Sequence, residues 1–393
     1  MALSRRNLIS ISAAALAAGA LAACSDERGG DTADPAPADG TTGAAPADGE
    51  TTPTGGEAGG LIGIAMPTKS LERWNRDGAH LEGLLKEMGY ETSLQYADNK
   101  QDQQNNQIQN MINDGAKVVV IASIDGTAMG PILQTAADAG VKVFAYDRLI
   151  NGTENVDYYA TFDNYKVGQL QGQYILDHMD DYKNDDGSIN LEPFAGSPDD
   201  NNVRYFFGGA WDLLGPEVEK GTFTVPSGKA PADSDGWASI GIQGWASSGA
   251  QSEMENRINS FYGDGKKVNI VLSPNDSLAL GIQQALEGAG YTPGEDWPLL
   301  TGQDADLANV QAMVQGKQTM DVWKDTRMLG EQVAKMVDQL VKGEEVETND
   351  TETYDNGVKV VPSFLIDPVV VTMDNIEEQL VESGFYTAED IGL

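Results

Sequence analysis

The chain has 393 residues and a formal net charge of −36, from 61 acidic and 25 basic residues. This length is enough for about two to three domains. The acidic balance argues against a nucleic-acid partner, because a phosphate backbone needs a basic surface, and it is typical of a protein that stays soluble in an external medium. Since Cys24 is the only cysteine and there are only two histidines, we expect no disulfide, no cysteine nucleophile, no metal centre and no cofactor.

The beginning of the chain has the pattern of an export signal. Paired arginines precede a long apolar stretch, as in a signal peptide of residues 1–23. The pair fits a twin-arginine signal as well as a general secretion signal. "LAAC" at 21–24 resembles a bacterial lipobox, in which the Cys24 thiol receives a lipid. We therefore expect an extracytoplasmic protein that a lipid on Cys24 anchors to the outer face of the cell membrane, with no segment spanning it.

Residues 24–60 are expected to be a disordered linker. They consist mainly of Gly, Pro, Thr, Ala, Asp and Glu, and such a composition cannot bury enough apolar surface to fold. From Leu61 onward, short apolar runs alternate with segments at helical spacing. Continuous apolar runs such as "KVVVIA" are typical of strands that are covered on both faces.

The predicted elements alternate along the rest of the chain. Strands are expected at 61–66, 92–96, 117–122, 141–146, 191–195, 222–226, 268–273, 298–302 and 319–323. Helices are expected around Leu81 and Ile108 and at 128–139, 165–179, 202–214, 248–261, 276–289, 306–315 and 326–342. This alternation predicts an α/β fold with parallel sheets. Because the units are too many for one compact sheet, two doubly wound lobes are predicted.

Polar residues follow many of the predicted strands. They are Asp147 and Arg148, Asn275 and Asp276, Gln303 and Asp304, Lys324 and Asp325, and the segment "SPDDNN" at 197–202. In open α/β sheets, ligands bind beyond the carboxyl ends of the strands. Asp and Asn are also favoured helix caps, so each site alone has a structural explanation. Together, carboxylates, amides and cations suit a ligand covered with hydroxyl groups, since each hydroxyl both donates and accepts.

Two tryptophans could complete such a site. A pyranose ring has apolar C–H faces that lie against aromatic rings. Trp74 follows the first strand, and Trp245 precedes a helix in the second half of the chain. The alternatives are that Trp74 packs as a hydrophobic staple on Leu81 and that Trp245 lies at the edge of a core.

Several strings resemble one protein family. They are "ERW", "ADN", "QNNQIQNMI", "AYDRLI", "FDNYKVG", "GSPDDNN", "LSPNDSLALGI", "TGQDA" and "DTETYDNGVKVVPSFL". In this order, from Leu61 to about Tyr386, they resemble the monosaccharide-binding proteins of sugar ABC importers, most of all the members that bind xylose or multiple sugars. The resemblance implies the periplasmic-binding-protein type I fold, in which two Rossmann-like lobes joined by a three-strand hinge close on a sugar. It also implies an ABC permease as the partner.

The resemblance also implies which residues bind the sugar. They are Arg73, Trp74, Asp147, Arg148, Asn202 with Asn201 beside it, Trp245, Asn275, Asp304 and Lys324. Near the first of these, Leu71 is expected to pack, and Arg76 is expected to be a solvated charge on the outer face of its helix.

The lobes implied by the resemblance are discontinuous. The N-terminal lobe comprises residues 61–162 plus 325–360, and the C-terminal lobe comprises residues 163–324 plus 361–393. The three crossovers are expected near Asp163, Lys324 and Val361.

The predicted function is capture of an aldose monosaccharide, of the xylose, glucose, galactose or arabinose type, by a monomer that carries out no chemical step. The same closed lobes could instead be recognised by a chemoreceptor or a sensor kinase. The cations Arg73, Arg148 and Lys324 leave an acidic sugar open. A glycoside hydrolase using Asp147 and Asp304 is disfavoured, because a cation or amide beside each carboxylate keeps it ionised rather than able to act as an acid.

Two further alternatives are also disfavoured. A sugar-responsive transcription regulator shares this fold, but the export signal and the acidic linker argue against it. The segment 181–192 resembles a calcium loop, but the required glycine at loop position six is Asp186. We expect a solvated acidic hairpin there.

Overall fold

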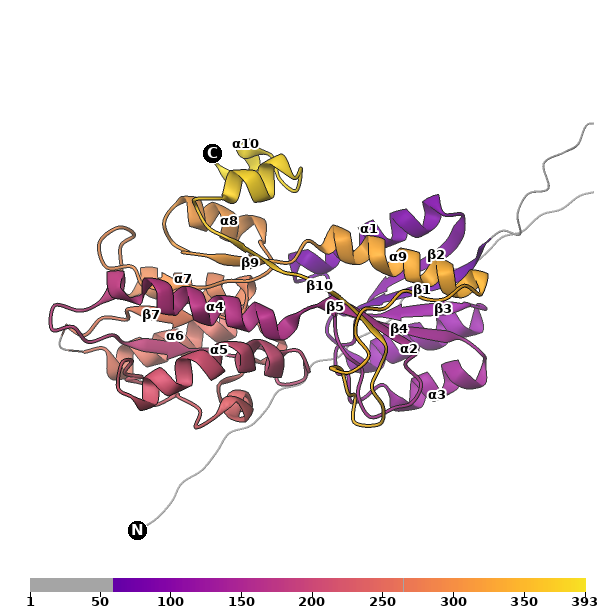
Figure 1. The fold of residues 1–393 in the computed structure, drawn as a ribbon, viewed down its shortest axis with the longest axis horizontal. Helices are drawn as coiled ribbons and strands as arrows, with labels where there is room; N and C mark the ends of the chain where they lie inside the picture. Colours follow the sequence, from indigo (N-terminus) through magenta and orange to yellow (C-terminus); the bar gives the residue numbers. More distant parts are fainter. Residues whose placement is uncertain (1–58, 264) are drawn as a thin grey trace, which may run out of the picture. The chain divides into compact units, whose positions relative to one another are not determined.

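The computed structural model describes residues 59–263 and 265–393. The expected signal peptide, Cys24 and nearly all of the linker lie outside these residues. The described chain forms two lobes, each built on a parallel sheet with helices on both faces (Figure 1). Across these residues, no helix is both long and apolar enough to cross a membrane.

The first lobe contains a six-stranded sheet in the order β10-β5-β4-β3-β1-β2, in which all neighbouring strands are parallel. Its strands are β1 (Gly59–Met66), β2 (Tyr90–Tyr96), β3 (Val118–Ile121), β4 (Lys142–Tyr146), β5 (Tyr158–Phe162) and β10 (Ser363–Ile366). Its helices are α1 (Glu72–Glu87), α2 (Gln101–Asn113), α3 (Gly130–Asp138) and α9 (Thr326–Lys342). In Figure 1, α9 (orange), from late in the chain, lies beside α1.

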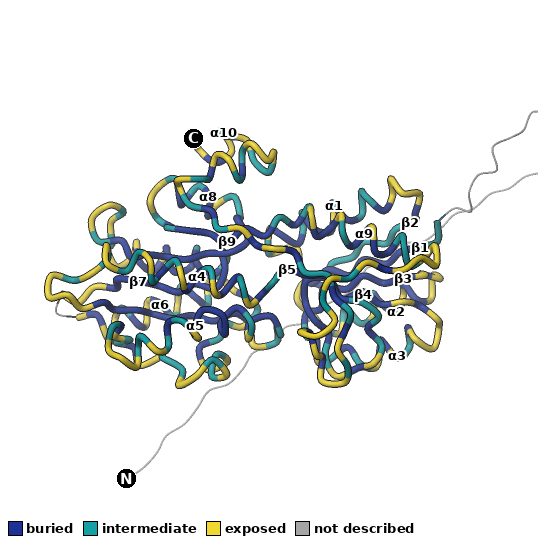
Figure 2. Tube along the Cα trace, viewed as in Figure 1, coloured by how far each residue is buried: buried dark blue, intermediate teal, exposed yellow. Residues whose placement is uncertain are grey.

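Alternate residues of β1 show why this sheet is covered on both faces. Ile62 and Ile64 belong to the core under α1 and α9, whereas Ala65 belongs to the core under α2 and α3. Successive strand residues point to opposite faces, so an apolar run without polar interruptions buries both. Figure 2 shows the central strands as buried and the outer faces of the helices as exposed.

The second lobe has shorter strands. A three-stranded parallel sheet has the order β6 (Leu191–Pro193), β7 (Ile270–Leu272), β8 (Leu299–Leu300), and β9 (Asp321–Trp323) pairs antiparallel with β11 (Val369–Val371). Its α-helices are α4 (Asn164–His178), α5 (Val203–Glu219), α6 (Ser247–Phe261), α7 (Asp276–Gly288), α8 (Leu307–Val314) and α10 (Ala388–Ile391). Short helical turns lie at Met179–Tyr182, Ser234–Ile240 and Gln243–Trp245, and a π-helical turn lies at Glu377–Glu382.

Helices α4 and α5 touch through their backbones. A Cβ atom added to Gly168 of α4 would lie 1.9 Å from the carbonyl oxygen of Phe206, and one added to Gly209 of α5 would lie 2.0 Å from the carbonyl oxygen of Tyr165. Only glycine permits so close an approach. Because α4 begins directly after β5 of the first lobe, this contact ties the start of α5 to the crossover between the lobes.

Two expectations about the strands are wrong. The segment 222–226 contributes an isolated bridge between Thr224 and Asn190 instead of a strand. The segment 361–366 was assigned to the C-terminal lobe, but β10 pairs with β5 of the first sheet. The third crossover therefore lies at Asp367 and Pro368, between β10 and β11, rather than near Val361. Proline lacks the N–H that would continue a strand ladder, which ends β10 at this point.

Candidate functional site

A cavity lies between the two lobes at the carboxyl ends of several strands. It is lined by Leu71, Arg73, Trp74, Asp147, Arg148, Asp200, Asn202, Phe206, Trp245, Asn275, Gln303, Asp304 and Lys324. The structure thus brings together every predicted ligand residue except Asn201, which does not line the cavity. The cavity measures about 30 Å³, which is room for one or two water molecules.

Arg73 forms the central ionic contact of this cavity. Its Nη2 donates to Asp77 and Asp147, both at 2.9 Å, and its Nη1 donates to Asp304 of the other lobe at 3.2 Å. Burial alone would lower the pKa of Arg73, but the three carboxylates raise it well above its ordinary value. The guanidinium is therefore a permanent cation that binds one carboxylate across the cleft.

Asp304 is held as an anion by two cations. Lys324 Nζ lies 2.9 Å from Asp304 Oδ1, which also accepts from Arg73. Burial would raise the pKa of Asp304, but Lys324 and Arg73 together bring it below its ordinary value. An ionised carboxylate is an acceptor only, so Asp304 can accept a hydrogen bond from a hydroxyl group but is poorly suited to donate a proton as a catalytic acid.

A second ion pair crosses the cleft beside the first. Arg148 Nε lies 2.9 Å from Asp200 Oδ2, and Arg148 Nη1 donates to the carbonyl oxygen of Ser123. The Trp245 indole N–H donates to the same Asp200 oxygen at 3.2 Å. Burial raises the pKa of Asp200, and Arg148 partly offsets the shift. Asp200 was not among the predicted ligand residues, although it lies within "GSPDDNN".

The two predicted tryptophans take part both in packing and in the cavity. Trp74 belongs to the first-lobe core that also contains Leu81, and it lines the cavity as well. Its ring lies 4.6 Å from the Arg73 guanidinium and 5.1 Å from that of Arg148. Trp245 rests on Gly196, where an added Cβ would lie 2.1 Å from the indole ring.

Two of the predicted asparagines make structural hydrogen bonds at the edge of the cavity. Asn202 Nδ2 donates to the Asp147 carbonyl at 2.6 Å, and Tyr159 donates to Asn202 Oδ1 at 3.1 Å, so Asn202 connects the lobes. Asn275 Oδ1 accepts from the Leu278 N–H at 3.1 Å and thereby caps α7. Asn275 therefore both caps α7 and lines the cavity.

The segment after β8 has an uncommon backbone conformation. Asp304 and Ala305 have φ angles of 100° and 50°, which cost non-glycine residues about 1–3 kcal/mol each. Two buried carboxylates hold the segment in place: Asp276 accepts from the Asp306 N–H at 2.7 Å, and Asp321 accepts from the Ala305 N–H at 3.1 Å. Strain supported in this way fixes the direction of the Asp304 side chain.

The supporting carboxylates Asp276 and Asp321 form a buried pair bridged by Gln318. Gln318 Nε2 donates to Asp276 at 3.0 Å and to Asp321 at 2.9 Å. Burial and the neighbouring Asp321 raise the pKa of Asp276 well above its ordinary value. Burial raises the pKa of Asp321 to about 7. Both shifts favour the protonated form of these neighbouring buried carboxylates.

Gln303 and Phe206 also line the cavity and were not predicted as ligand residues. Gln303 is buried, and its Oε1 has no hydrogen-bond partner among the described residues. The position of Gln303 directly after a predicted strand was a usable signal. Phe206 had no comparable signal, because its ring resembles any core aromatic in sequence.

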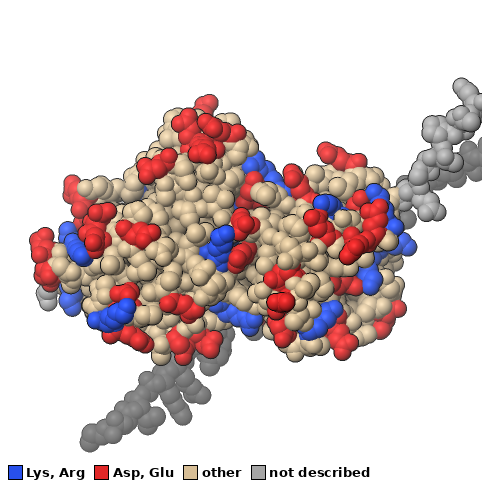
Figure 3. All heavy atoms as spheres, in the orientation of Figure 1, with Lys and Arg blue, Asp and Glu red and all other residues tan. Residues whose placement is uncertain are grey.

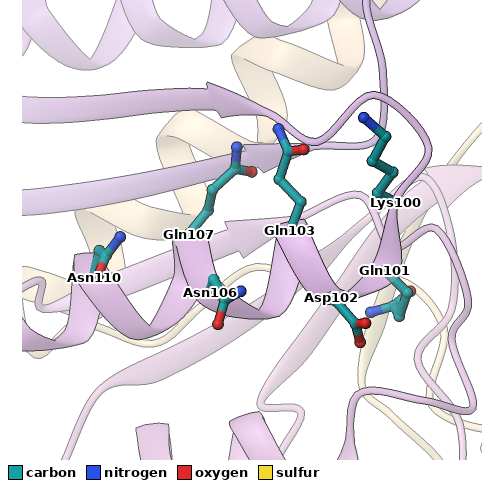
Figure 4. Close-up of a pocket in the computed structure, with 7 residues that line it drawn as sticks. All are labelled: Lys100, Gln101, Asp102, Gln103, Asn106, Gln107 and Asn110. Atoms are coloured by element: carbon teal, nitrogen blue, oxygen red, sulfur yellow. The ribbon is translucent and has the colours of Figure 1, made fainter. Parts of the chain in front are cut away.

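A second hollow lies on the outside of the first lobe and is less suited to a small ligand. It is open, about 590 Å³ in volume, and lined by Lys100, Gln101, Asp102, Gln103, Asn106, Gln107 and Asn110 of α2 and its N-terminus (Figure 4). The Gln103 and Gln107 amides are already used by the Tyr96 carbonyl. No ion-pair cluster like that of the interlobe cavity converges there among the described residues.

The acidic segment 181–192 lines an open hollow of the second lobe, about 1020 Å³ in volume. Acidic side chains are spread over the face in Figure 3, with basic ones interspersed. Asp186 accepts from Ser188 within its own turn. Across residues 59–263 and 265–393, no group of three or more His, Cys, Asp or Glu side chains could hold a metal ion.

Comparison with known proteins identifies the family to which this chain is similar. Residues 62–345 match the family model of the periplasmic binding protein domain. The multiple sugar-binding periplasmic receptor of Rhizobium radiobacter is 46% identical over 333 residues, which are 84% of this chain and 92% of the receptor. The D-xylose-binding periplasmic protein of Haemophilus influenzae is 34% identical over 84% of this chain and 91% of its own length.

A solved structure agrees in both fold and sequence. The ABC transporter solute-binding protein of Clostridium phytofermentans with bound β-D-glucose is 48% identical, with a TM-score of 0.79 over 84% of this chain and 99% of that protein. The fold is thus the periplasmic binding protein type I fold, and this family consists of binding proteins rather than enzymes. The chain belongs to the periplasmic sugar-binding proteins of ABC transporters.

Proposed function

We propose that this protein captures a neutral aldose monosaccharide in the interlobe cavity and delivers it to the permease of an ABC importer. The observation that carries the proposal is the pairing of donors and acceptors across the cleft. Arg73 and Arg148 of the first lobe face Asp304 and Asp200 of the second. A sugar hydroxyl can accept from the arginine and donate to the carboxylate of such a pair.

The charge balance supports a neutral sugar over a uronic acid. Each cavity cation is already opposed by at least one carboxylate: Arg73 by three, Arg148 by Asp200, and Lys324 by Asp304. A sugar carboxylate would therefore enter beside existing anions without an uncompensated cation to receive it. Like charges at close range in a buried site disfavour binding.

The ligands of similar proteins support a neutral monosaccharide. They include a receptor for multiple sugars, a D-xylose-binding protein and a solute-binding protein with bound β-D-glucose. Trp74 and Trp245 on opposite lobes supply flat apolar surfaces for the C–H faces of a pyranose ring. We propose Arg73, Trp74, Asp147, Arg148, Asn202, Trp245, Asn275, Asp304 and Lys324 as sugar contacts, with Asp200 and Gln303 added and Asn201 removed.

Sugar entry requires the lobes to separate. The cavity of about 30 Å³ is smaller than a monosaccharide, so the pairs Arg73–Asp304 and Arg148–Asp200 have to part before a ligand can enter. The crossovers near Asp163, at Lys324 and Asp325, and at Asp367 and Pro368 are the segments about which such a movement would turn. The sugar would then replace cross-cleft ion pairs with its own hydrogen bonds.

We also propose attachment to the outer face of the membrane through a lipid on Cys24, with residues 25–58 as the tether. The support is the lipobox-like sequence "LAAC" after an export signal. A labelled fatty acid fed to cells should be incorporated into the wild-type chain and not into Cys24→Ser. Equal labelling of both chains would show that the thiol is not the attachment site.

The test of the function is isothermal titration with xylose, glucose, galactose, arabinose and glucuronic acid. We expect binding of at least one neutral aldose with a Kd of about 1 μM or lower, typical of nutrient capture at −8 kcal/mol or below, and weaker binding of glucuronic acid. Trp74→Ala and Arg148→Ala should lose most of the affinity while remaining folded. Arg204→Ala changes an exposed arginine of α5 and should keep the wild-type affinity. Absence of binding to every neutral sugar would refute the proposal.

A further inference from the structure

Arg76 does not lie where the sequence analysis placed it. It was expected to be a solvated charge on the outer face of its helix, but its side chain is only 25% exposed and contacts the other lobe. Arg76 Nη2 lies 3.2 Å from Asp306 Oδ1, and Nη1 donates to Tyr386 Oη and, at 2.8 Å, to Glu72 of its own helix. The expectation was wrong because no local pattern in α1 reports what the second lobe places opposite it.

The contact is reinforced by two aromatic rings near the C-terminus of the chain. The Arg76 guanidinium lies 4.9 Å from the centroid of Phe385 and 5.9 Å from that of Tyr386. Such cation–π contacts are attractive and become stronger where water is excluded. The arginine is thus held by an acid, a phenol and two ring faces from segments 80 residues apart in the second lobe.

The same phenol supports the loop that carries Asp304. The Tyr386 hydroxyl donates to the Ala305 carbonyl at 2.9 Å, while its oxygen accepts from Arg76. Asp304 and Ala305 are the two residues of this segment that have positive φ angles. A chain of hydrogen bonds therefore runs from α1 of the first lobe to the strained segment of the second.

Two arginines of α1 face two aspartates of this segment in parallel. Arg73 pairs with Asp304 inside the cavity, and Arg76 pairs with Asp306 outside it. Residues three apart on a helix lie on the same face, so one helix face meets one loop. Of these four residues, only Arg73 and Asp304 line the cavity. A sugar would displace the inner pair, but it would leave the outer pair intact.

The outer pair also has an electrostatic reason to form. Burial, Asp276 and Asp304 raise the pKa of Asp306 well above its ordinary value, and Arg76 acts in the opposite direction. When the lobes part, Arg76 leaves Asp306 among other carboxylates. Closure brings the cation back, so this contact favours the closed arrangement whichever sugar is bound.

We infer that Arg76, Asp306 and Tyr386 form an interlobe clasp that positions the Asp304 segment against α1 and sets the lifetime of the closed sugar complex. The clasp rests on the proposed function for its ligand, but it makes no contact with the cavity. It therefore acts on dissociation of every sugar alike and does not discriminate among sugars. Arg76 is a positioning residue for Asp304 in this arrangement.

The first experiment is stopped-flow tryptophan fluorescence with glucose and xylose on the full chain. We expect Arg76→Ala to increase koff about 3- to 10-fold for both sugars, as the loss of a partly buried ion pair with aromatic contacts implies, and to leave kon within about twofold. Arg76→Lys should restore part of the effect, because it keeps the charge and loses the planar contact. In a double-mutant cycle, Asp306→Asn should add little to Arg76→Ala.

The matched control is Lys86→Ala. Lys86 lies on the same helix and pairs with Glu82 at 2.9 Å within one lobe, so its removal should leave koff unchanged. The clasp is refuted if Arg76→Ala leaves koff at the wild-type value, changes it no more than Lys86→Ala does, or changes the ratio of koff between glucose and xylose.

A second experiment needs no sugar. In a Cys24→Ser chain, dyes on cysteines introduced at the exposed positions Glu87 and Glu219, one in each lobe, report the separation of the lobes by energy transfer. Arg76→Ala should shift the distribution toward larger separation, and an unchanged distribution would oppose the clasp. If the wild type binds no sugar, the proposed function fails, whereas this measurement still decides on the clasp.

Discussion

Two buried networks of charged side chains are built from the same kinds of hydrogen bond and ion pair, but they differ in which lobe their members come from. In the second lobe, Glu192 accepts from the Ser227 N–H and hydroxyl, from Tyr262 at 2.6 Å and from Arg257 at 3.0 Å. In the cavity, Arg73 donates to Asp77, Asp147 and Asp304. Every partner of Glu192 belongs to its own lobe, whereas Arg73 takes one of its partners from the lobe opposite.

The difference shows how one kind of interaction can serve either stability or movement. A charge whose partners all lie in one lobe stays compensated when the lobes open, so the Glu192 network contributes to folding and is insensitive to ligand. The Arg73 network loses Asp304 on opening, so part of its energy belongs to the conformational equilibrium. A hydroxylated ligand can then substitute for the lost partner.

The largest expected effect is on the Glu192 network. Glu192→Ala leaves the buried Arg257 without this carboxylate and should lower the free energy of unfolding by about 3–5 kcal/mol, measured by urea denaturation. Sugar affinity of the folded protein should stay at the wild-type value, because Glu192 does not line the cavity. Glu192→Gln, which keeps one acceptor oxygen, should be less destabilising. An unchanged unfolding midpoint in Glu192→Ala would remove the contrast between the networks.

An intermediate effect is expected in the cavity network. Arg73→Lys keeps the charge but loses the planar fork that reaches carboxylates of both lobes. Sugar binding should weaken about 10- to 100-fold, as the loss of charge-assisted hydrogen bonds of about 1.5–3 kcal/mol implies, in calorimetric titration with glucose.

The control for this variant is Arg204→Lys, at an exposed arginine whose guanidinium lies over Tyr205 of the same lobe. It should bind glucose as the wild type does. Equal Kd values for Arg73→Lys and the wild type would mean that charge alone, without the fork geometry, maintains the site.

The smallest effect concerns the raised pKa of Asp321, which lies behind the Asp304 segment. The pKa of Asp321 is about 7 in the folded protein and about 4 in an unfolded chain. Between these two pH values, the folded protein therefore binds more protons than the unfolded chain. The contribution of Asp321 to stability is present below about pH 4 and is lost as the pH rises through about 7. Thermal midpoints of the wild type should therefore fall over this range relative to Asp321→Asn.

Asp304 has the opposite effect on stability, at pH values below this range. Its pKa is lowered in the folded protein, so its contribution is present above the unfolded pKa and is lost as the pH falls through the folded value. A wild-type midpoint that rises from about pH 4 to about pH 7 in parallel with that of Asp321→Asn would show that the pKa of Asp321 is not raised.

Much of the cavity could be predicted from the sequence because buried strands end at a common edge. Asp147, Arg148, Asn275, Asp304 and Lys324 follow such strands, and they line one cavity. The helix pattern was equally informative for α9, whose bounds match the predicted 326–342. Both signals are local: an apolar run or stripe and the polar residue that follows it.

The remaining features depend on contacts that no local pattern records. Segment 364–371 is one apolar run broken only by Asp367 and Pro368, and the break alone does not tell which sheet each half joins. Arg76 has the same immediate surroundings in sequence as a solvated helix charge, and only Asp306 and Tyr386 from the second lobe bury it. Asp200 was missed because its role is to pair with Arg148 from the other lobe.

Gly196 has a consequence for ligand size. The Trp245 ring fills the space that a side chain at position 196 would occupy, and its N–H is committed to Asp200. A methyl group at position 196 would have to displace the indole ring, either into the interlobe cavity or away from its hydrogen-bond partner Asp200. Glycine at this position therefore keeps the Trp245 ring in place, and a larger residue would change both the shape of the cavity and the hydrogen bond of the ring.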